Sequence, residues 1–222
     1  MSNRSQGHGN PCQPYFVGSL VVLPDKRTIR GMADNGDIAL ESLRRRMRAV
    51  QSLYRDATAT MDASHVNHVA LPGMLPIAFS LFHIVNMIDV SIGIVTGKPA
   101  LWNDSWAERV KPAINDHGKH RTVGEMMHQR IGDYPQFVVY MNEVFLRLDD
   151  CLTALTPEDL GRILVARPLP PQVASTFSAR VAGPEGISVL DALECWIYQH
   201  ALRHMGEIEL SRGALGLGGM TS

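Results

Sequence analysis

The chain has 222 residues, 45% of them hydrophobic, and carries 21 lysines and arginines against 22 aspartates and glutamates. A net charge of −1 excludes a strong positive field for nucleic acid or an acidic membrane, so we expect a small molecule or a protein as partner. The three cysteines, Cys12, Cys151 and Cys195, form neither a CxxC pair nor a disulfide framework. No secretory signal is apparent, and these features together favour a cytoplasmic protein.

We expect residues 1–32 to form an N-terminal extension and residues 33–219 to form one helical domain. A first helix is predicted from about Asn35 to Met61, where apolar residues recur at steps of three and four. This stripe consists of Leu40, Leu43, Met47, Val50, Tyr54, Ala57 and Met61. A short basic run, residues 44–48, crosses it and is either a nucleic-acid patch or, as we prefer, a solvated helix face.

The second predicted helix runs from about Pro76 to Val95 and is apolar nearly all round. Its length would suit a membrane span, but His83, Asn86 and Asp89 would be costly at mid-membrane depth. A helix of this composition in a soluble protein is normally the central, most buried one. The Gly97 that follows is a typical helix stop.

The third helix is predicted from about Pro135 to Leu155, with Cys151 on its apolar stripe, and the fourth from Ser188 to about Leu210. Ser188 and the aspartate three residues later form a predicted capping box. Two long connections, residues 98–133 and 163–187, join these helices, and no β pattern of any length competes. The sequence therefore predicts an all-α protein, a four-helix bundle with two long elaborated connections.

His200 and His204 are four residues apart in the fourth helix and continue its apolar line into the bundle. Buried imidazoles need partners, and one metal ion satisfies both at once. An HxxxH pair also arises by chance among nine histidines, and Ala201 replaces the glutamate of the HExxH protease motif. A third ligand should come from another buried helix. His83 is the candidate, the alternative being a hydrogen-bonded core histidine.

Other polar and aromatic residues have two interpretations each. Glu207 would orient a ligand imidazole or hold a proton, or else pair with Arg203 or Arg212. Arg212 would meet a substrate carboxylate, or only complement the helix dipole. The tryptophans of the first long connection, Trp102 and Trp106, would line a lid or pack that connection onto the bundle. Five further histidines are assigned to loops or the surface: His65, His68, His117, His120 and His128.

Three segments together carry a family resemblance: SLFHIVNMID in the second helix, TGKPALWNDSW after it, and YQHALRHMGEIELSRGALGLGG in the last helix. From about Leu40 to Gly219 the chain resembles the DinB/YfiT-like superfamily of metal-binding bundles. The resemblance implies a four-helix bundle, often a homodimer, with His83, His200 and His204 on one divalent ion. Similar proteins include transferases and isomerases that use low-molecular-weight thiols such as mycothiol, bacillithiol or glutathione.

Three neutral imidazoles leave an open position on an ion, as in catalytic sites. A thiol bound there loses its proton more readily, so the leading expectation is transfer of a small thiol, or isomerisation through it, onto an electrophile. The alternatives are a metal-dependent hydrolase, or a non-enzymatic, metal-stabilised bundle that binds a partner in a stress response. We expect zinc or nickel, with iron or copper also open. Neither Cys151, on the core stripe of the third helix, nor Cys195, away from the line through Ile197 and His200, is expected to be the nucleophile.

Overall fold

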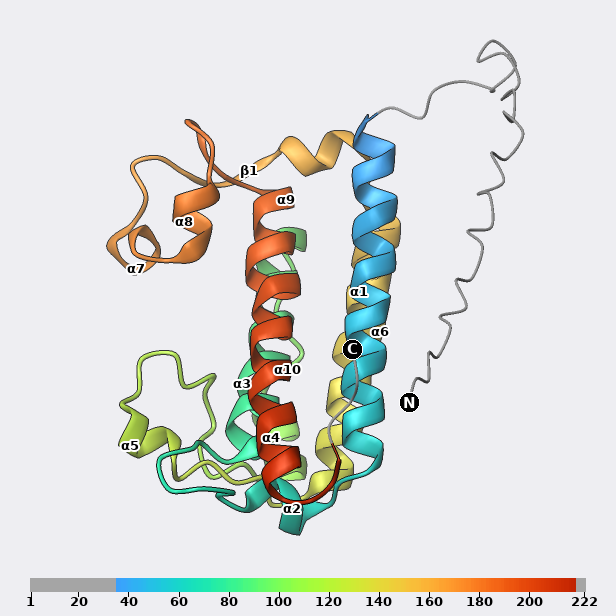
Figure 1. The fold of residues 1–222 in the computed structure, drawn as a ribbon. Helices are drawn as coiled ribbons and strands as arrows, with labels where there is room; N and C mark the ends of the chain where they lie inside the picture. The colour runs from blue at the N-terminus through green and yellow to red at the C-terminus, as the bar shows by residue number, and fades with distance from the viewer. Residues whose placement is uncertain (1–34, 219–222) are drawn as a thin grey trace, which may run out of the picture. The chain divides into compact units, whose positions relative to one another are not determined.

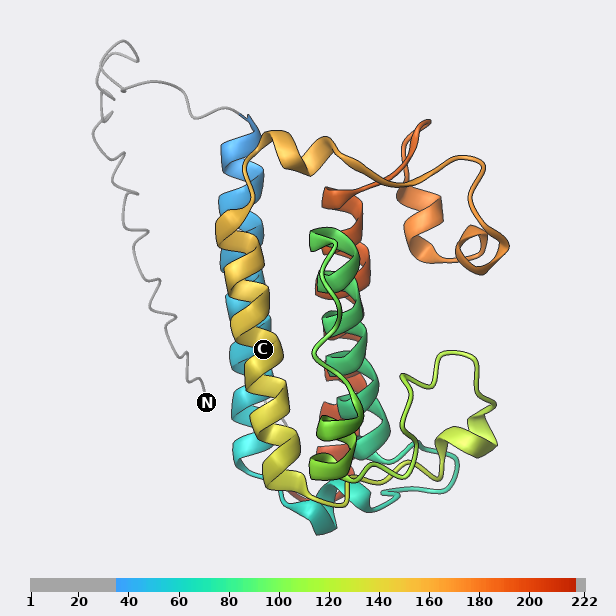
Figure 2. The same cartoon turned by 180° about the vertical axis from the view of Figure 1, so that it is seen from behind.

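The computed structural model describes residues 35–218 of the chain. The N-terminal extension predicted at residues 1–32 lies outside the described residues. Four long helical segments dominate: α1 (Asn35–Ala59), α3 (Ile77–Thr96), α6 (Tyr134–Ala154) and the last segment, which ends in α10 (Gln199–Ala214). Helix α1 lies beside α6, and α3 lies beside α10 (Figures 1 and 2). The predicted all-α four-helix bundle is therefore confirmed.

Helix α3 is the core of this bundle. It is long and apolar enough to cross a membrane by composition, but 78% of its most apolar stretch is buried inside the protein. It ends where Gly97 takes a left-handed conformation, at φ 71°. This stop matches the one that the sequence predicts, because glycine adopts a positive φ without steric cost.

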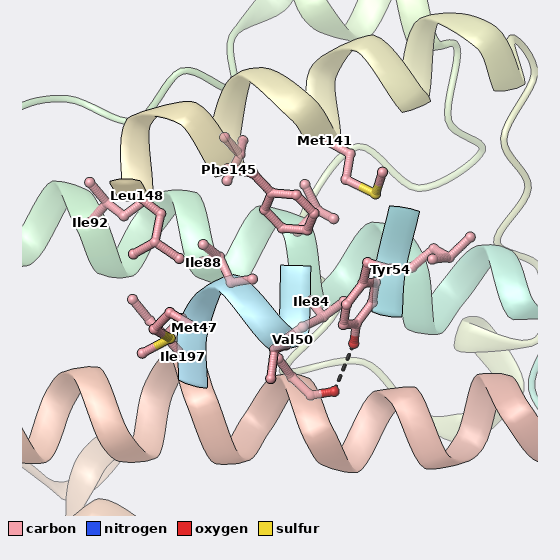
Figure 3. Close-up of a cluster of buried hydrophobic side chains, with 14 of the residues drawn as sticks. Met47, Val50, Tyr54, Ile84, Ile88, Ile92, Met141, Phe145, Leu148 and Ile197 are labelled. Atoms are coloured by element: carbon pink, nitrogen blue, oxygen red, sulfur yellow. Dashed lines mark hydrogen bonds between the residues drawn. The ribbon is translucent and has the colours of Figure 1, made fainter. Parts of the chain in front are cut away.

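The interior is filled by the apolar stripes of all four long segments. Figure 3 shows side chains from α1, α3, α6 and the last helical segment meeting in one cluster. Tyr54 is fully buried within it, and its hydroxyl donates a hydrogen bond of 2.7 Å to the carbonyl oxygen of Ala201. Cys151 is 7% exposed, as its place in the stripe of the third helix predicts. The core thus ties α1 to α10 through a polar contact as well as through packing.

The first long connection contains the short helices α4 (Asp104–Val110) and α5 (Val123–Met126). Its start is held by the fully buried Asp89 of α3, whose carboxylate accepts hydrogen bonds from the backbone N–H groups of Leu101 and Trp102. Arg147 forms an ion pair with the same carboxylate at 2.7 Å. A buried carboxylate needs such partners, so Asp89 fixes the start of this connection against α3 and α6.

The second long connection contains a small antiparallel sheet, which the sequence analysis did not predict. Strand β1 (Ile163–Ala166) pairs with β2 (Gly186–Ser188), and helices α7 (Pro171–Ala174) and α8 (Phe177–Val181) lie between them. Strands of three and four residues are too short to show alternating hydrophobicity. At Gly186, φ is 143° and a Cβ atom would lie 2.1 Å from the carbonyl oxygen of Val165, so the pairing requires glycine there.

The last helical segment also differs from the uninterrupted helix that the sequence suggests. It begins as α9 (Val189–Ala192), continues as a π-helical turn (Leu193–Tyr198) and only then becomes α10. The capping box between Ser188 and Asp191 is present as predicted. The wider π turn changes the angular register, so a helical projection begun at Leu190 does not extend unchanged to His200.

Remaining short elements complete the described chain. Helix α2 (Ala63–Asn67) precedes α3, and a 3₁₀ turn (Glu158–Gly161) follows α6. The parts of the two long connections around α5, α7 and α8 lie on the side of the bundle formed by α3 and α10 (Figure 1), whereas α4 packs against α6. The elaborations of the bundle are therefore concentrated around the helices that carry His83, His200 and His204.

Candidate metal centre

The side chains of His83, His200 and His204 converge between α3 and α10. The Nε2 atom of His200 lies 3.2 Å from Nε2 of His83 and 3.0 Å from Nε2 of His204. The three rings offer their ligand atoms within 4.8 Å of one another. His83 and His204 are each only 8% exposed. The structure thus brings together all three histidines that the sequence analysis named as ligands.

For His83 and His204, a contact at Nδ1 determines which of the two ring nitrogens carries the proton. His83 donates from Nδ1 to the carbonyl oxygen of His117, and Nδ1 of His204 lies 2.7 Å from Oε2 of Glu207. The backbone of Trp196, one turn before His200, favours the protonated form of that ring and so opposes the lowering of its pKa. With the proton on the outer nitrogen, each neutral ring directs an Nε2 lone pair toward the others.

Three lone pairs at this separation repel one another unless a cation lies between them. Ligand nitrogens about 2.1 Å from one ion stand about 3.0 to 3.4 Å apart for octahedral to tetrahedral angles, which matches the two separations measured from Nε2 of His200. The donor set of three neutral imidazoles suits a divalent transition metal. The residues present therefore fit the metal ion that the sequence led us to expect.

The electrostatics of the cluster keep two of the histidines neutral. Burial lowers the pKa of His83 to about 4, with the neighbouring His204 adding to the effect. Burial also lowers the pKa of His200 to about 3, and again the adjacent histidines contribute. Both rings consequently remain unprotonated and able to bind a metal at neutral pH.

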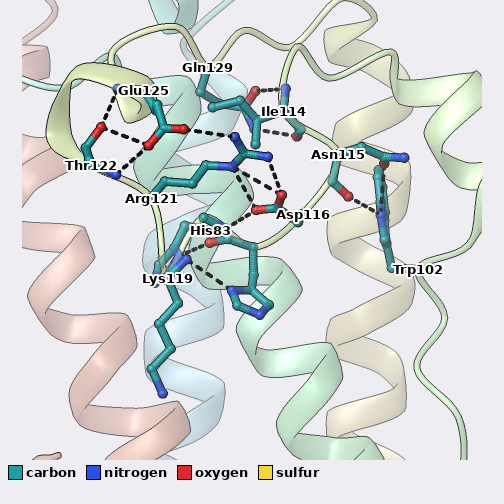
Figure 4. A network of polar contacts seen from close by, with 12 residues as sticks. His83, Trp102, Ile114, Asn115, Asp116, Lys119, Arg121, Thr122, Glu125 and Gln129 are labelled. Atoms are coloured by element: carbon teal, nitrogen blue, oxygen red, sulfur yellow. Dashed lines mark hydrogen bonds and ion pairs between the residues drawn. The ribbon is translucent and has the colours of Figure 1, made fainter. Parts of the chain in front are cut away.

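The carbonyl of His117 is held in place by a network in the first long connection (Figure 4). The carboxylate of Asp116 pairs with Arg121 and accepts a 2.8 Å hydrogen bond from the N–H of Gly118. Gly118 itself has φ 74°, and a Cβ atom there would lie 2.8 Å from the ring of Phe79. The close approach of this turn to α3 is what brings the carbonyl to His83.

Glu207 lies one turn beyond His204 on α10. Its Oε2 atom also accepts a 2.8 Å hydrogen bond from the hydroxyl of Ser80. Burial alone would raise the pKa of Glu207, but the hydrogen bonds from His204 and Ser80 outweigh it and lower that pKa. Within the described chain Glu207 forms no ion pair with Arg203 or Arg212. Glu207 thus occupies the orienting position, and a catalytic proton-transfer role for it stays a prediction.

Arg212 lies elsewhere. It is 4% exposed and donates hydrogen bonds of 2.9 Å to the carbonyl oxygen of Ala57 and the hydroxyl of Thr60. These contacts connect the end of α10 to the end of α1, and Arg212 is absent from the lining of the pocket beside the histidines. Its position suits the stabilisation of a helix end better than the binding of a substrate carboxylate.

A pocket of about 470 Å³ opens beside the cluster, with His83 and His200 in its wall. Its other walls come from α3, both long connections and the π turn. Cys195 and Trp196 line it as well. The sequence analysis placed Cys195 away from the line through His200, and the π turn accounts for the difference. The pocket itself was not predicted, since residues from four separate segments form it.

The remaining candidates differ in whether they line the pocket. His117 and His120 lie in the first long connection, in agreement with their assignment to loops, and they also line the pocket. Trp102 packs edge-on against Phe82 and Tyr140 at ring-centre distances of 4.9 Å and does not line the pocket. Of the two roles considered for this tryptophan, the structure therefore favours packing of the connection onto the bundle.

Residues 39–208 match the family model of the DinB superfamily. The chain belongs to the DinB superfamily. A solved structure described as a conserved protein of a locus from Enterococcus faecalis is similar to this DinB protein, with 15% sequence identity and a TM-score of 0.62. The match covers 83% of this chain and 99% of that one, and at such identity it supports the fold alone. No curated protein gives a significant match.

Proposed function

We propose that this DinB protein is a metal-dependent enzyme that transfers a low-molecular-weight thiol to an electrophile, or isomerises a substrate through that thiol. The observation that carries the proposal is an incomplete ligand set beside a pocket. Among the described residues, no fourth His, Cys, Asp or Glu side chain joins the three-histidine cluster. A structural ion would be expected to have a closed protein shell, whereas this cluster borders a pocket of about 470 Å³.

A divalent ion, when bound, would lower the pKa of a coordinated thiol and so supply a thiolate at neutral pH. The protein's own part is to present His83, His200 and His204 as neutral ligands with fixed ring orientations. Glu207 holds the tautomer of His204 through the 2.7 Å contact at Nδ1.

The protein's own pocket thiol is poorly suited to act as the nucleophile. Burial raises the pKa of Cys195 to about 11, and the negative charges of Asp191 and Glu194 add to the effect. Cys195 is therefore a neutral thiol at pH 7, which is unreactive compared with a thiolate. The sulfur would then come from a small external thiol. Zinc or nickel as the ion, a homodimeric assembly and a cytoplasmic location complete the proposal.

Cobalt substitution tests the proposal directly. Adding glutathione, or another small cellular thiol, to the cobalt-loaded protein should produce a sulfur-to-metal charge-transfer band that saturates with thiol concentration. The band should be lost in His204→Ala and retained in His128→Ala, a control histidine on an exposed loop. If no thiol changes the metal spectrum while Glu207→Gln changes it strongly, Glu207 caps the ion and the role of the ion is structural.

A further inference from the structure

Part of the wall of the pocket beside the histidines is apolar, and its residues come from two segments of the chain. Met87, Val90 and Ile94 line it from successive turns of α3, and Val165 and Phe177 line it from the second long connection. Phe177 and Ile94 are 51% and 48% exposed, so neither belongs to the interior of the bundle. Large apolar side chains exposed at the wall of a pocket are typical of a site that binds an apolar ligand.

The other side of the same pocket is cationic. Lys119 lines it from the first long connection, and Arg203 lines it from α10. The imidazoles of His117 and His120 lie there too, and no carboxylate is among the described lining residues. This asymmetry stands out in a chain whose formal net charge is only −1. The pocket therefore has a local field that favours an anion.

Several other cations of this protein are used in ion pairs. Arg46 pairs with Glu194, Arg121 with Asp116, and Arg147 with Asp89. Within residues 35–218, by contrast, neither Arg203 nor Lys119 has an ion-pair partner. Arg203 follows His200 by three residues on α10, and both residues line the pocket. An uncompensated guanidinium thus stands next to the three-histidine cluster.

We propose that the pocket binds an amphipathic carboxylate, with its anionic group at Arg203 and Lys119 and its apolar chain against Met87, Ile94 and Phe177. This inference rests on the proposed function, because it names the class of molecule that is brought to the metal centre. A volume of about 470 Å³ lies within the range of small-molecule sites. An amine of the same length would meet two positive charges and is disfavoured.

Three thiols of equal length test the charge preference at the metal centre: 6-mercaptohexanoate, 6-mercaptohexanol and 6-aminohexanethiol. Their dissociation constants are measured from the charge-transfer band of the cobalt-loaded protein. We expect the acid to bind about five- to tenfold more tightly than the alcohol, with the amine weakest, as exposed charge pairs allow. Arg203→Gln should remove most of this preference. Arg45→Gln, which neutralises an exposed arginine of α1 outside the pocket, should leave it unchanged.

A second comparison tests the apolar side. Lengthening the ligand from 3-mercaptopropanoate to 6-mercaptohexanoate should tighten binding, by up to about fourfold for each fully buried CH₂ group. Phe177→Ala should reduce that gain, and because Phe177 is half exposed the substitution should leave the fold intact. Equal affinities for the acid, the alcohol and the amine would overturn the inference while leaving thiol transfer standing.

Binding of octanoate, followed by calorimetry on the zinc-loaded protein, separates the two proposals. If no thiol reaches the metal but octanoate binds more tightly than octylamine, and Arg203→Gln abolishes the difference, the carboxylate site stands and thiol transfer fails. If octanoate and octylamine bind equally, or neither binds, the carboxylate site is overturned whatever the thiols do.

Discussion

Nδ1 of His204 and Oε2 of Glu207 lie 2.7 Å apart, one helical turn from each other on α10. This contact places the proton of His204 on the outer nitrogen and leaves Nε2 free to face His83 and His200. The hydroxyl of Ser80 on α3 donates to the same carboxylate oxygen at 2.8 Å. Glu207 therefore couples the orientation of one candidate ligand to the packing of the two helices that carry all three.

Removal of this carboxylate should weaken metal binding without removing a ligand. We expect Glu207→Ala to lower the affinity for zinc about 10- to 100-fold, because His204 loses the partner that fixes its tautomer. Competition with a chelator of known affinity measures the change. Glu143→Ala, on an exposed face of α6, is the matched control and should bind zinc like the wild type. Unchanged affinity in Glu207→Ala would contradict an orienting role.

A glycine that is not itself a ligand should also affect the site. Gly118→Ala places a methyl group 2.8 Å from the ring of Phe79 at a residue with φ 74°, so the turn has to move. The carbonyl oxygen of His117 would move with it and leave His83 without its partner. We expect Gly118→Ala to reduce the zinc affinity. Gly124→Ala should leave it unchanged, because the nearest atom to a Cβ built at Gly124 lies 4.0 Å away. Equal zinc affinities in the two variants would argue that the turn at Gly118 does not hold His83 in place.

The buried histidines predict a specific pH dependence for the metal-free protein. In the folded state burial lowers the pKa of His83 to about 4 and the pKa of His200 to about 3, from the ordinary histidine value of 6.5. As the pH falls below about 6.5 the unfolded chain takes up protons that the folded protein does not, so the free energy of unfolding decreases down to about pH 4. Chemical denaturation of the metal-free protein at a series of pH values across this range measures the free energy of unfolding. The double variant His83→Gln, His200→Gln should show a flatter dependence, and an equally steep one would contradict the assignment.

Replacement of both described cysteines tests the source of the sulfur. Cys151 is a core thiol and burial raises its pKa, while the thiol of Cys195 is neutral for the reason given above. The double variant Cys151→Ala, Cys195→Ser should therefore keep its thiol-dependent activity and its metal content. Loss of activity in a folded, metal-loaded variant would show that the protein supplies the sulfur itself.

The sequence predicts the bundle well because each long helix has a strong and local signal. The stripe from Leu40 to Met61, the uniformly apolar α3 and the capping box at Ser188 all depend on residues within a few turns of one another. The same periodicity points His83 toward the interior, whereas His200 and His204 follow a π turn that shifts the register of the last helical segment. The meeting of three side chains then requires only that the two helices pack together.

What the sequence could not reveal depends on contacts between distant segments. The backbone carbonyl of His117 reaches His83 across 34 residues, and a carbonyl leaves no trace in the side-chain pattern. The π turn rotates Cys195 and Trp196 into the pocket, but a π turn has no sequence signature of comparable strength. Among these features, only Gly118 had a signal in the sequence, because it is a glycine that lies between two histidines of a long connection.

The central claim is that three histidines form one metal site, and metal content tests it most directly. Zinc per chain is measured after dialysis against a weak chelator in the wild type, in His83→Ala, His200→Ala and His204→Ala, and in one double variant. We predict about one ion in the wild type, most of it lost in every single variant, and little further loss in the double variant, since residues that act as a unit are not additive. Full metal content in any single variant, or no metal in the wild type, would contradict the claim.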